Sequence, residues 1–552
     1  MALYLGLDSS TQSLTAVVIQ IDDDERRVLL ETSLNFDEVL PHYGTRNGVL
    51  PDADPAVGLA PPLMWAEALD VMMGRLADAI DVRQVAAISG SAQQHGSVYL
   101  NASATATLGS LDAGRPLVDQ VRGAFSRDTS PIWMDSTTTE ECGEITASLG
   151  AAGDVRLARA TGSRAFERFT GPQIRRFFKR DPLAYEATDR IHLVSSFMAS
   201  LLAGCQAPLE PGDASGMNLM DLTTKQWWPE AIAATAPGLA SKLPPIVDPW
   251  TCIGVLAPYW QIRCGFPAAS VIAWTGDNPS SLVGVGLARD GQVAISLGTS
   301  DTVFGPMSEA RVNDSGTGHV FGAPTGAYMA LTCFQNGSLA RERVRTDQGM
   351  SWAEFSQALA STPPGNGGHM MLPWFAPEIT PPIAAPSIHR YGPAGGGGSD
   401  VRAVVEAQMM SMAFHTRWMT DRIDVIHATG GAAVNREILQ VMADVFGARV
   451  LRLTVGNSAA LGAALRAAHG HRRTCEPRTE WADVLAGVAE PLAESRVDPD
   501  PDRQAMYREM IPLYALCEAH ARGRAGDPQE LIEQFSRALP AWSHWNKLQG
   551  ER

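Results

Sequence analysis

Three short turns of small and hydroxyl-bearing residues are the first features of this sequence that could do chemistry. They are D-S-S-T at residues 8–11, G-T-S at residues 298–300, and the pair Gly430 and Gly431. Small residues at tight turns leave backbone N–H groups open to an anion without a side-chain clash, as phosphate binding requires. Such residues also fill ordinary hairpin turns. Only the three turns together therefore indicate a nucleotide or phosphate site.

Neither standard phosphate-binding motif accompanies these turns. The sequence has no G-x-x-x-x-G-K-[ST] loop, and no G-x-G-x-x-G stands between a strand and a helix with an acidic residue downstream, which disfavours P-loop and Rossmann sites. A metal ion would then have to carry much of the phosphate charge. Asp8, at the end of the first predicted strand, could hold a hydrated Mg²⁺, which keeps its waters and needs only one or two carboxylates.

Asp277, in T-G-D-N-P-S-S-L-V-G at residues 275–284, allows two interpretations. Asn278 followed by Pro279 before an apolar run is a standard helix N-cap with proline at the first helical position. The preceding aspartate would then be an ordinary turn residue. Alternatively, a carboxylate held at a helix start is well placed to act as a base. The local pattern does not separate the two.

Two similar hairpins must position these turns. Leu3, Leu5 and Leu7 alternate before the polar turn and T-A-V-V-I-Q-I follows it, while residues 292–305 repeat the order strand, small-residue turn, strand. The repetition indicates a duplicated architecture. Alternating strands and helices favour α/β domains over a barrel or a helical bundle, with a ligand site between two domains.

Other elements carry further candidates. Residues 85–100 are strand-like around a polar loop that holds His95, and Thr137 with Glu140 predicts a capping box that starts a helix. After Gly430 and Gly431 a helix is predicted, with Ile438, Met442 and Val445 on its apolar face and Gly447 as its stop. The alanine-rich stretch from Asn457 predicts a tightly packed core helix.

Three further segments are expected to lie mainly at the surface. Residues 366–399 are rich in Pro and Gly and predict a mobile surface loop. Residues 472–503 are expected to be peripheral. The basic run 164–180 is expected to form mostly a solvated helix face with Phe residues turned inward, although an arginine could face a site.

Composition and charge limit the classes of protein to which the sequence can belong. The chain has 552 residues, of which 45% are hydrophobic and 19% charged, which predicts a well-packed globular protein of more than one domain. Its formal net charge of -16 argues against a nucleic-acid partner. The 7 cysteines form no C-x-x-C pair, as in a reducing compartment. The N-terminus lacks the features of a secretion signal, and no apolar run is long enough for a membrane span. A cytoplasmic protein without a membrane partner is expected.

Five motifs in order resemble the FGGY carbohydrate kinases. They are G-L-D-S-S-T-Q-S-L-T-A-V-V, S-A-Q-Q-H-G-S, T-G-D-N-P-S-S-L, S-L-G-T-S-D-T and G-G-A-A-V-N-R-E-I-L-Q. Within the family the sequence looks most like the longer, animal-type xylulose kinases, which it also resembles in R-A-F-E-R-F-T-G, D-A-S-G-M-N-L and N-G-S-L-A-R-E. The match runs through nearly the whole chain.

The resemblance implies two actin-like domains of ribonuclease H type with a cleft between them. Residues 1–272 would form the N-terminal, sugar-binding domain, and residues 273–552 the C-terminal, nucleotide-binding domain. The implied reaction is ATP-dependent phosphorylation of D-xylulose to D-xylulose 5-phosphate with Mg²⁺, on small-molecule substrates only. A monomer or homodimer is expected.

The resemblance also assigns roles. Asp277 would be the general base, and His95, Arg168 and Asn278 would bind the sugar together with it. Asp8 would hold the metal through water. The residues expected at ATP are Ser10, Thr11, Gly298, Thr299, Trp352, Gly430, Gly431 and Asn435.

Two departures and two alternatives qualify these roles. Many relatives have a basic residue soon after D-S-S-T, where this chain has Q-S-L-T-A, so the resemblance implies no basic phosphate contact from that hairpin. Thr137 stands where many bacterial members have the arginine of W-x-D-x-R, which implies a reduced or different role for Asp135. One alternative is the same chemistry on D-ribulose, L-xylulose or glycerol. The other is a catalytically silent, nucleotide-driven sugar sensor.

Overall fold

The computed structural model describes residues 2–22, 25–313, 316–395, 398–453 and 456–539. The chain divides into two compact units. Unit 1 comprises Met1–Ala288, Pro306–Ala330 and Val455–Glu490, and unit 2 comprises Arg289–Gly305, Leu331–Thr454 and Pro491–Arg552. Unit 1 thus continues beyond the boundary expected between residues 272 and 273, and it also includes a segment from the last fifth of the chain.

Unit 1 is built on a seven-stranded sheet in which the first hairpin is central. β1 (Leu3–Ser9) pairs antiparallel with β2 (Ser13–Ile21), and β2 pairs antiparallel with β3 (Arg26–Asn35). On its other side β1 pairs parallel with β5 (Val85–Ala92). The sheet continues through β12 (Ser270–Ile272) to β11 (Cys252–Val255), and β13 (Thr275–Gly276) also pairs with β5. The hairpin predicted at the start of the chain is confirmed.

Unit 2 repeats this arrangement. β14 (Gln292–Leu297) pairs antiparallel with β15 (Asp301–Met307) and parallel with β20 (Val425–Thr429). β21 (Arg449–Arg452) and β22 (Leu492–Val497) follow in the sheet order. Each sheet therefore contains an antiparallel hairpin whose first strand also pairs with a parallel strand, β5 in unit 1 and β20 in unit 2. This shared arrangement confirms the predicted α/β duplication.

The alternation in β1 sends side chains to opposite faces of the sheet, and each face has its own core. Leu3, Leu5 and Leu7 pack with residues of α2 (Pro62–Ala79) and α9 (Val194–Ala203). Tyr4 packs with the alanine-rich α18 (Ser458–Cys475). Such alternation is expected for a strand that is covered on both faces.

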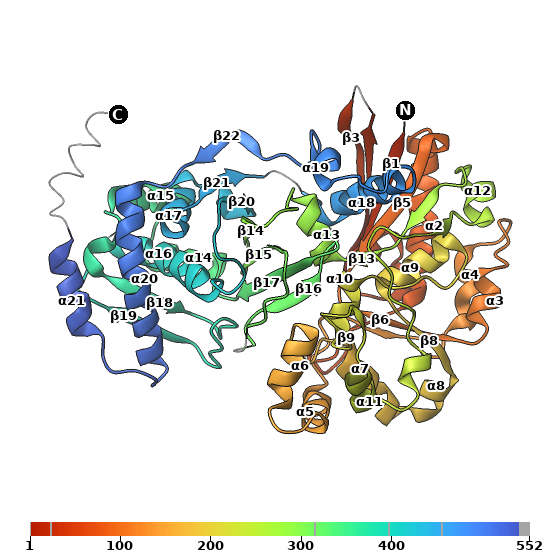
Figure 1. The fold of residues 1–552 in the computed structure, drawn as a ribbon, viewed down its shortest axis with the longest axis horizontal. Coiled ribbons are helices and arrows are strands. Elements are labelled where there is room, and N and C mark those ends of the chain that lie inside the picture. The colour runs from red at the N-terminus through yellow and green to blue at the C-terminus, as the bar shows by residue number, and fades with distance from the viewer. Residues whose placement is uncertain (1, 23–24, 314–315, 396–397, 454–455, 540–552) are drawn as a thin grey trace. The chain divides into compact units, whose positions relative to one another are not determined.

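Helix α18 approaches the sheet very closely. A Cβ on Gly6 would lie 2.1 Å from the carbonyl oxygen of Ala460, so only glycine fits there. The helix packs against β1, β5 and α13 (Asp277–Gly284), and Figure 1 shows it beside strands from the N-terminal end of the chain. The predicted tightly packed core helix is confirmed, and this packing explains why its segment belongs to unit 1.

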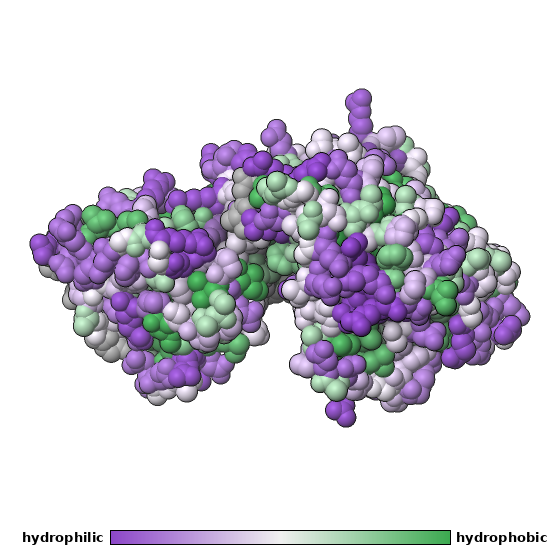
Figure 2. All heavy atoms as spheres, turned by 90° about the horizontal axis from the view of Figure 1, so that it is seen from below, coloured by the Kyte–Doolittle hydropathy of each residue, from purple (hydrophilic) through white to green (hydrophobic). Residues whose placement is uncertain are grey.

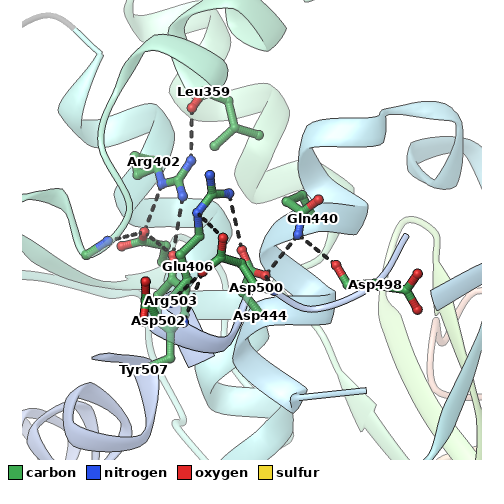
Figure 3. Close-up of polar contacts among 11 residues, drawn as sticks. Leu359, Arg402, Glu406, Gln440, Asp444, Asp498, Asp500, Asp502, Arg503 and Tyr507 are labelled. Atoms are coloured by element: carbon green, nitrogen blue, oxygen red, sulfur yellow. Dashed lines mark hydrogen bonds and ion pairs between the residues drawn. The ribbon is translucent and has the colours of Figure 1, made fainter. Parts of the chain in front are cut away.

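A buried polar network in unit 2 joins three helices, α16 (Ser399–His415), α17 (Arg436–Phe446) and α20 (Pro501–Ala521) (Figure 3). Arg402 donates to Glu406 at 2.8 Å and to the carbonyl oxygen of Leu359 at 3.0 Å, and Tyr507 donates to the same Glu406 at 2.6 Å. Asp444 of α17 accepts from the backbone N–H of Asp500, which precedes α20, at 2.8 Å, and its other carboxylate oxygen lies 3.5 Å from the guanidinium of Arg503. The network fixes the helix that follows the Gly430–Gly431 turn. That helix has the predicted apolar face, and it ends at the predicted Gly447.

Two local predictions are wrong. Helix α5 begins at Thr139 after Thr138, with no side-chain cap, because the Thr137 hydroxyl donates to Asp135 at 2.6 Å instead of forming a capping box. Within residues 366–399, β18 (Met370–Trp374) and β19 (Ser387–Tyr391) form an antiparallel pair rather than a loop. The apolar run M-M-L-P-W of β18 is fully buried. Residues 396–397 of the glycine run lie outside the described residues.

The surface mixes polar and apolar side chains. On the face that Figure 2 shows, apolar residues form small patches separated by hydrophilic ones. Among the residues described, no helix combines the length and the apolar character needed to cross a membrane.

Candidate active site

Asp277 is the first residue of α13, which begins after Gly276 without a side-chain cap. The predicted N-cap at Asn278 is therefore wrong, since the helix starts one residue earlier. One carboxylate oxygen of Asp277 accepts from the backbone N–H of Asn278 at 2.8 Å and from its side-chain amide at 3.0 Å. Burial raises the pKa of Asp277 to about 6, against hydrogen bonds that lower it. The result is a fixed carboxylate that is ionised at neutral pH.

The side chain of Asn278 links this carboxylate to the Q-Q-H-G loop. Its amide also donates to Gln94 Oε1 at 2.9 Å, and Gln94 Nε2 donates to the carbonyl oxygen of Gly212 at 3.3 Å. Gly276 has no room for a side chain, because a Cβ there would lie 2.4 Å from Gln94 Cγ. The structure thus brings Asn278 and Asp277 together, as the motifs imply, and adds Gln94 to them.

Asp8 is a second carboxylate close enough to interact with Asp277. It is buried at the end of β1, where its Oδ1 accepts from the Ser91 hydroxyl at 2.7 Å. Burial and then the charge of Asp277 raise the pKa of Asp8 to about 7. A nearby cation would favour the ionised form of both carboxylates.

Asp8 offers one carboxylate to a cation, and Asp277 lies close enough to interact with it. Among the described residues, no group of three or more His, Cys, Asp or Glu side chains is arranged to hold a metal ion. Mg²⁺ suits such a place because it retains several waters and accepts one or two carboxylates. The residues therefore fit a hydrated Mg²⁺ held through water.

His95 has a defined tautomer. Its backbone is left-handed, with φ of 73°, and its Nδ1 lies 2.7 Å from the carbonyl oxygen of Gly216. A carbonyl only accepts, so Nδ1 carries the proton and Nε2 of the neutral ring is an acceptor. Burial, followed by the charges of Arg168 and His319, lowers the pKa of His95 to about 3, against the Gly216 bond. The ring is therefore a neutral hydrogen-bond acceptor.

Aromatic rings and an arginine surround His95. The ring of Phe169 lies 4.3 Å from that of His95 and 5.6 Å from that of His319, between ring centroids. Phe321 lies 6.4 Å from His95. Arg168 is exposed beside them, and after burial its charge is the main cause of the lowered pKa of His319, about 4. The predicted residues His95 and Arg168 are thus neighbours, whereas His319 and Phe321 were missed because no motif marks them.

The first polar turn is largely engaged with its own hairpin. The Ser10 hydroxyl bonds the carbonyl oxygen of Ser13 at 3.0 Å. Thr11 Oγ1 accepts at 2.8 Å from the indole of Trp133, the tryptophan of the W-x-D segment, for which the sequence predicts no role. Asp135, close by, is buried and accepts from Gly58, Thr137 and Gln173. Its carboxylate is occupied in holding the loop that carries Trp133.

Unit 2 contains a pocket of 910 Å³ around the other polar turns, a size typical of small-molecule sites, which span roughly 300–1,000 Å³. Two large apolar side chains in its wall remain accessible, Trp352 at 49% and Val434 at 71% exposed. Asn435 caps α17 and donates to Ser356 at 2.7 Å. The expected ATP residues that line the pocket are Gly298, Thr299, Trp352, Gly431 and Asn435.

Gly430 supports this pocket rather than lining it. Its φ is 86°, and a Cβ would lie 2.5 Å from the carbonyl oxygen of Leu297 at the end of β14. Only glycine combines that backbone with so close an approach. The turn after β20 therefore packs directly on the strand that leads into Gly298.

A buried ion pair supports the Gly298–Thr299 side of the pocket. Arg341 donates to both oxygens of Asp301, at 2.8 and 3.0 Å, and each side chain is 1% exposed. Gly298 makes a backbone hydrogen bond to the Asp301 carboxyl, and the Ser338 N–H donates to the carbonyl oxygen of Gly298 at 2.9 Å. The pair thus joins α14 (Ser338–Asp347) to the turn.

Comparison with known proteins identifies the family of the chain. Residues 129–284 match the N-terminal domain and residues 293–471 the C-terminal domain of the FGGY family of carbohydrate kinases. The chain is 41% identical to a xylulose kinase of Rattus norvegicus over 544 residues, covering 95% of this chain and 98% of that protein. It is 42% identical to xylulose kinase 2 of Arabidopsis thaliana over 495 residues, covering 85% and 87%.

Solved structures with a similar fold include a xylulose kinase. A xylulose kinase structure from Rhodospirillum rubrum superposes with a TM-score of 0.78 at 18% identity, covering 94% of this chain and 99% of that chain. The predicted family is confirmed by sequence and by fold, including the likeness to an animal protein. The chain belongs to the FGGY family of carbohydrate kinases and is a sugar kinase.

Proposed function

We propose that the protein transfers the γ-phosphoryl group of ATP to the O5 hydroxyl of D-xylulose, giving D-xylulose 5-phosphate and ADP. The names of the relatives that cover most of the chain support this substrate. The observation that carries the chemistry is Asp277, a fixed carboxylate with a pKa of about 6. Such a group is largely ionised at neutral pH and can still accept a proton, which is what a general base requires.

In the proposed reaction Asp277 takes the proton of the attacking hydroxyl. The new bond joins the sugar oxygen to the γ-phosphorus, and the bond from that phosphorus to the oxygen of ADP breaks. Asn278 holds one carboxylate oxygen of Asp277 through two hydrogen bonds. The protein therefore supplies a base of fixed orientation, while the phosphoryl transfer itself depends mainly on positioning and charge stabilisation.

Unit 1 supplies the groups for the sugar. His95 offers Nε2 as an acceptor, so it would recognise a hydroxyl that donates, and exposed Arg168 would donate to a second oxygen. The amide of Asn278 completes the set. Acceptor and donor positions fixed in this way discriminate between sugars, because the wrong isomer leaves a polar group unpaired.

Unit 2 supplies the groups for the nucleotide. The exposed apolar faces of Trp352 and Val434 suit the two sides of an adenine ring. Gly431 and Asn435 would lie along the adenosine, with Gly430 supporting them. The Gly298–Thr299 turn suits the phosphates. Ser10 and Thr11 of unit 1 are proposed as further contacts of ATP.

Mg²⁺ would be held by Asp8 through water. When bound, the ion neutralises charge on the phosphates of ATP. The raised pKa of Asp8 supports this role, since Asp8 and Asp277 lie close enough to repel each other. Asp8 then keeps its carboxylate ionised in the presence of the metal.

A coupled assay of ADP release over D-xylulose, D-ribulose, L-xylulose and glycerol tests the function. We expect D-xylulose to have the highest kcat/KM. A clear preference for another acceptor would replace the substrate while leaving the sugar kinase in place. Nucleotide binding without turnover of any of the four would instead favour the silent sensor.

A further inference from the structure

His319 is a half-buried histidine with one ring nitrogen bonded and the other open to a ligand. Its Nδ1 lies 3.0 Å from the hydroxyl oxygen of Ser163. The described residues provide no hydrogen-bond partner for Nε2 of His319, and that atom is not among their buried, unpaired polar atoms. Nε2 is therefore accessible, and its hydrogen-bonding capacity is unused by the protein.

His319 and His95 are held by the same short segment of unit 1. His319 is the first residue of β16 (His319–Gly322), and the backbone N–H of Gly322 donates to the Ser215 hydroxyl at 3.1 Å. The next residue, Gly216, accepts from Nδ1 of His95 at 2.7 Å. One segment thus fixes the positions of both histidines.

His319 is also a neighbour of the two residues proposed to bind the sugar. The Phe169 ring lies 5.6 Å from the His319 ring and 4.3 Å from the His95 ring, between centroids. Phe321 stacks on His319 at 5.9 Å and lies 6.4 Å from His95. His319 is close enough to His95 to interact with it electrostatically, and Arg168 is close enough to act on both histidines. These contacts bring His319 to the place in unit 1 where His95 and Arg168 meet.

The contact with Ser163 defines the tautomer of His319. Ser163 is 1% exposed, and His319 Nδ1 is the only partner that the described residues provide for its hydroxyl. If the ring donated to this hydroxyl, the hydroxyl proton would be buried without an acceptor, which is unfavourable. Ser163 therefore donates to Nδ1, and Nε2 of the neutral ring carries the hydrogen. Burial, followed by the charge of Arg168, lowers the pKa of His319 to about 4, so the ring is neutral at neutral pH.

We propose that His319 donates a hydrogen bond from Nε2 to an oxygen of the sugar, and so is a further specificity-determining residue. The inference rests on the proposed function, which assigns the sugar to His95 and Arg168. His95 offers an acceptor and His319 a donor, so the two rings recognise oxygens that play opposite roles. A sugar that presents hydrogen instead of oxygen to Nε2 leaves this donor unpaired and binds more weakly.

The test replaces His319 with phenylalanine, which removes the donor and keeps an aromatic ring. For the best acceptor among D-xylulose, D-ribulose, L-xylulose and glycerol, we expect the KM to rise about three- to tenfold, the equivalent of one lost hydrogen bond. The KM for ATP should not change. His319→Phe leaves the Ser163 hydroxyl without its partner, so the melting temperature should fall.

A double variant separates binding from stability. His319→Phe with Ser163→Ala removes both partners of the hydrogen bond, which is nearly neutral for stability. It should recover most of the melting temperature and keep the raised KM for the sugar. A stable double variant with the wild-type KM for the sugar would overturn the inference and leave His319 a structural residue.

His389→Phe is the matched control. His389 is also half-buried, its ring stacks on Tyr391 at 6.4 Å between centroids, and it hydrogen-bonds the Ser387 hydroxyl, but it belongs to β19 of unit 2. This control should keep the wild-type KM for the sugar. An equal rise in its KM would show that the effect comes from lost stability and would also overturn the inference. If the wild type phosphorylates none of the four acceptors, the proposed function fails instead.

Discussion

At the scale of single residues, the most informative feature is a carboxylate whose charge is costly in the folded protein. Asp277 has a pKa of about 6 because burial outweighs its hydrogen bonds. Activity that depends on the ionised form should rise with pH through about 6 and be lost as pH falls below it. A profile of kcat/KM against pH measures this directly.

The Asp277→Asn variant should lose about 10²- to 10⁴-fold in kcat, the usual contribution of a general base. Nucleotide affinity, measured by calorimetry, should remain. The substitution also removes the charge of half-buried Asp277 near Asp8, so the melting temperature should not fall. Full turnover by this variant would remove Asp277 from the mechanism.

His95 should act without titrating. Its pKa of about 3 keeps the ring neutral at every pH where the enzyme works. We expect His95→Ala to raise the sugar KM about tenfold or more, because it removes a fixed acceptor, with little change in the KM for ATP. An ionisation near pH 6.5 in wild-type sugar binding that disappears in His95→Ala would contradict the neutral-acceptor role.

At the scale of elements, the ion pair of Arg341 and Asp301 should couple stability to nucleotide binding. Arg341→Met leaves Asp301 buried and unpaired, which costs about 3–5 kcal/mol, and it loosens the Gly298–Thr299 turn. Thermal unfolding should show the destabilisation, and the KM for ATP should rise while that for the sugar stays constant.

Two further variants separate the effects. Asp301→Leu with Arg341→Met replaces both charges, which is often neutral for stability, yet the turn should remain loose and ATP binding weak. Arg343→Met on the same helix removes an exposed pair, at 63% and 49% side-chain exposure, and should change neither property. Normal ATP affinity in the stable double variant would show that the pair has no part in binding.

The elements also show how far the sequence predicts the structure. The hairpins follow from the local alternation of apolar residues, and α18 follows from its alanine content. Burial in the fold then stabilises both kinds of element. The Asn-Pro pair predicts a start of α13 that is too late, because it is a strong local signal although the helix already begins at Asp277. The contacts of His319 with Phe169 and of Trp133 with Thr11 join segments distant in the chain, and no local pattern carries that information.

At the scale of the whole molecule, the proposed substrates bind to different units. Sugar groups such as His95 and Asp277 belong to unit 1, whereas the pocket with Trp352 belongs to unit 2. Transfer requires the two substrates to meet with water excluded. We therefore expect small-angle scattering to show a smaller radius of gyration with D-xylulose and a nonhydrolysable ATP analogue together than with neither. An unchanged radius would count against closure.

The close contact between α18 and Gly6 also has a consequence for synthesis of the chain on the ribosome. The first 288 residues of unit 1 emerge early, but the helix that covers one face of their sheet lies at Ser458–Cys475. At about 5–20 residues per second, on the order of ten seconds passes before that helix is made. During this interval the apolar residues Tyr4, Val17 and Ile19 lack their partner, so the nascent protein is expected to depend on chaperones until its last third is complete.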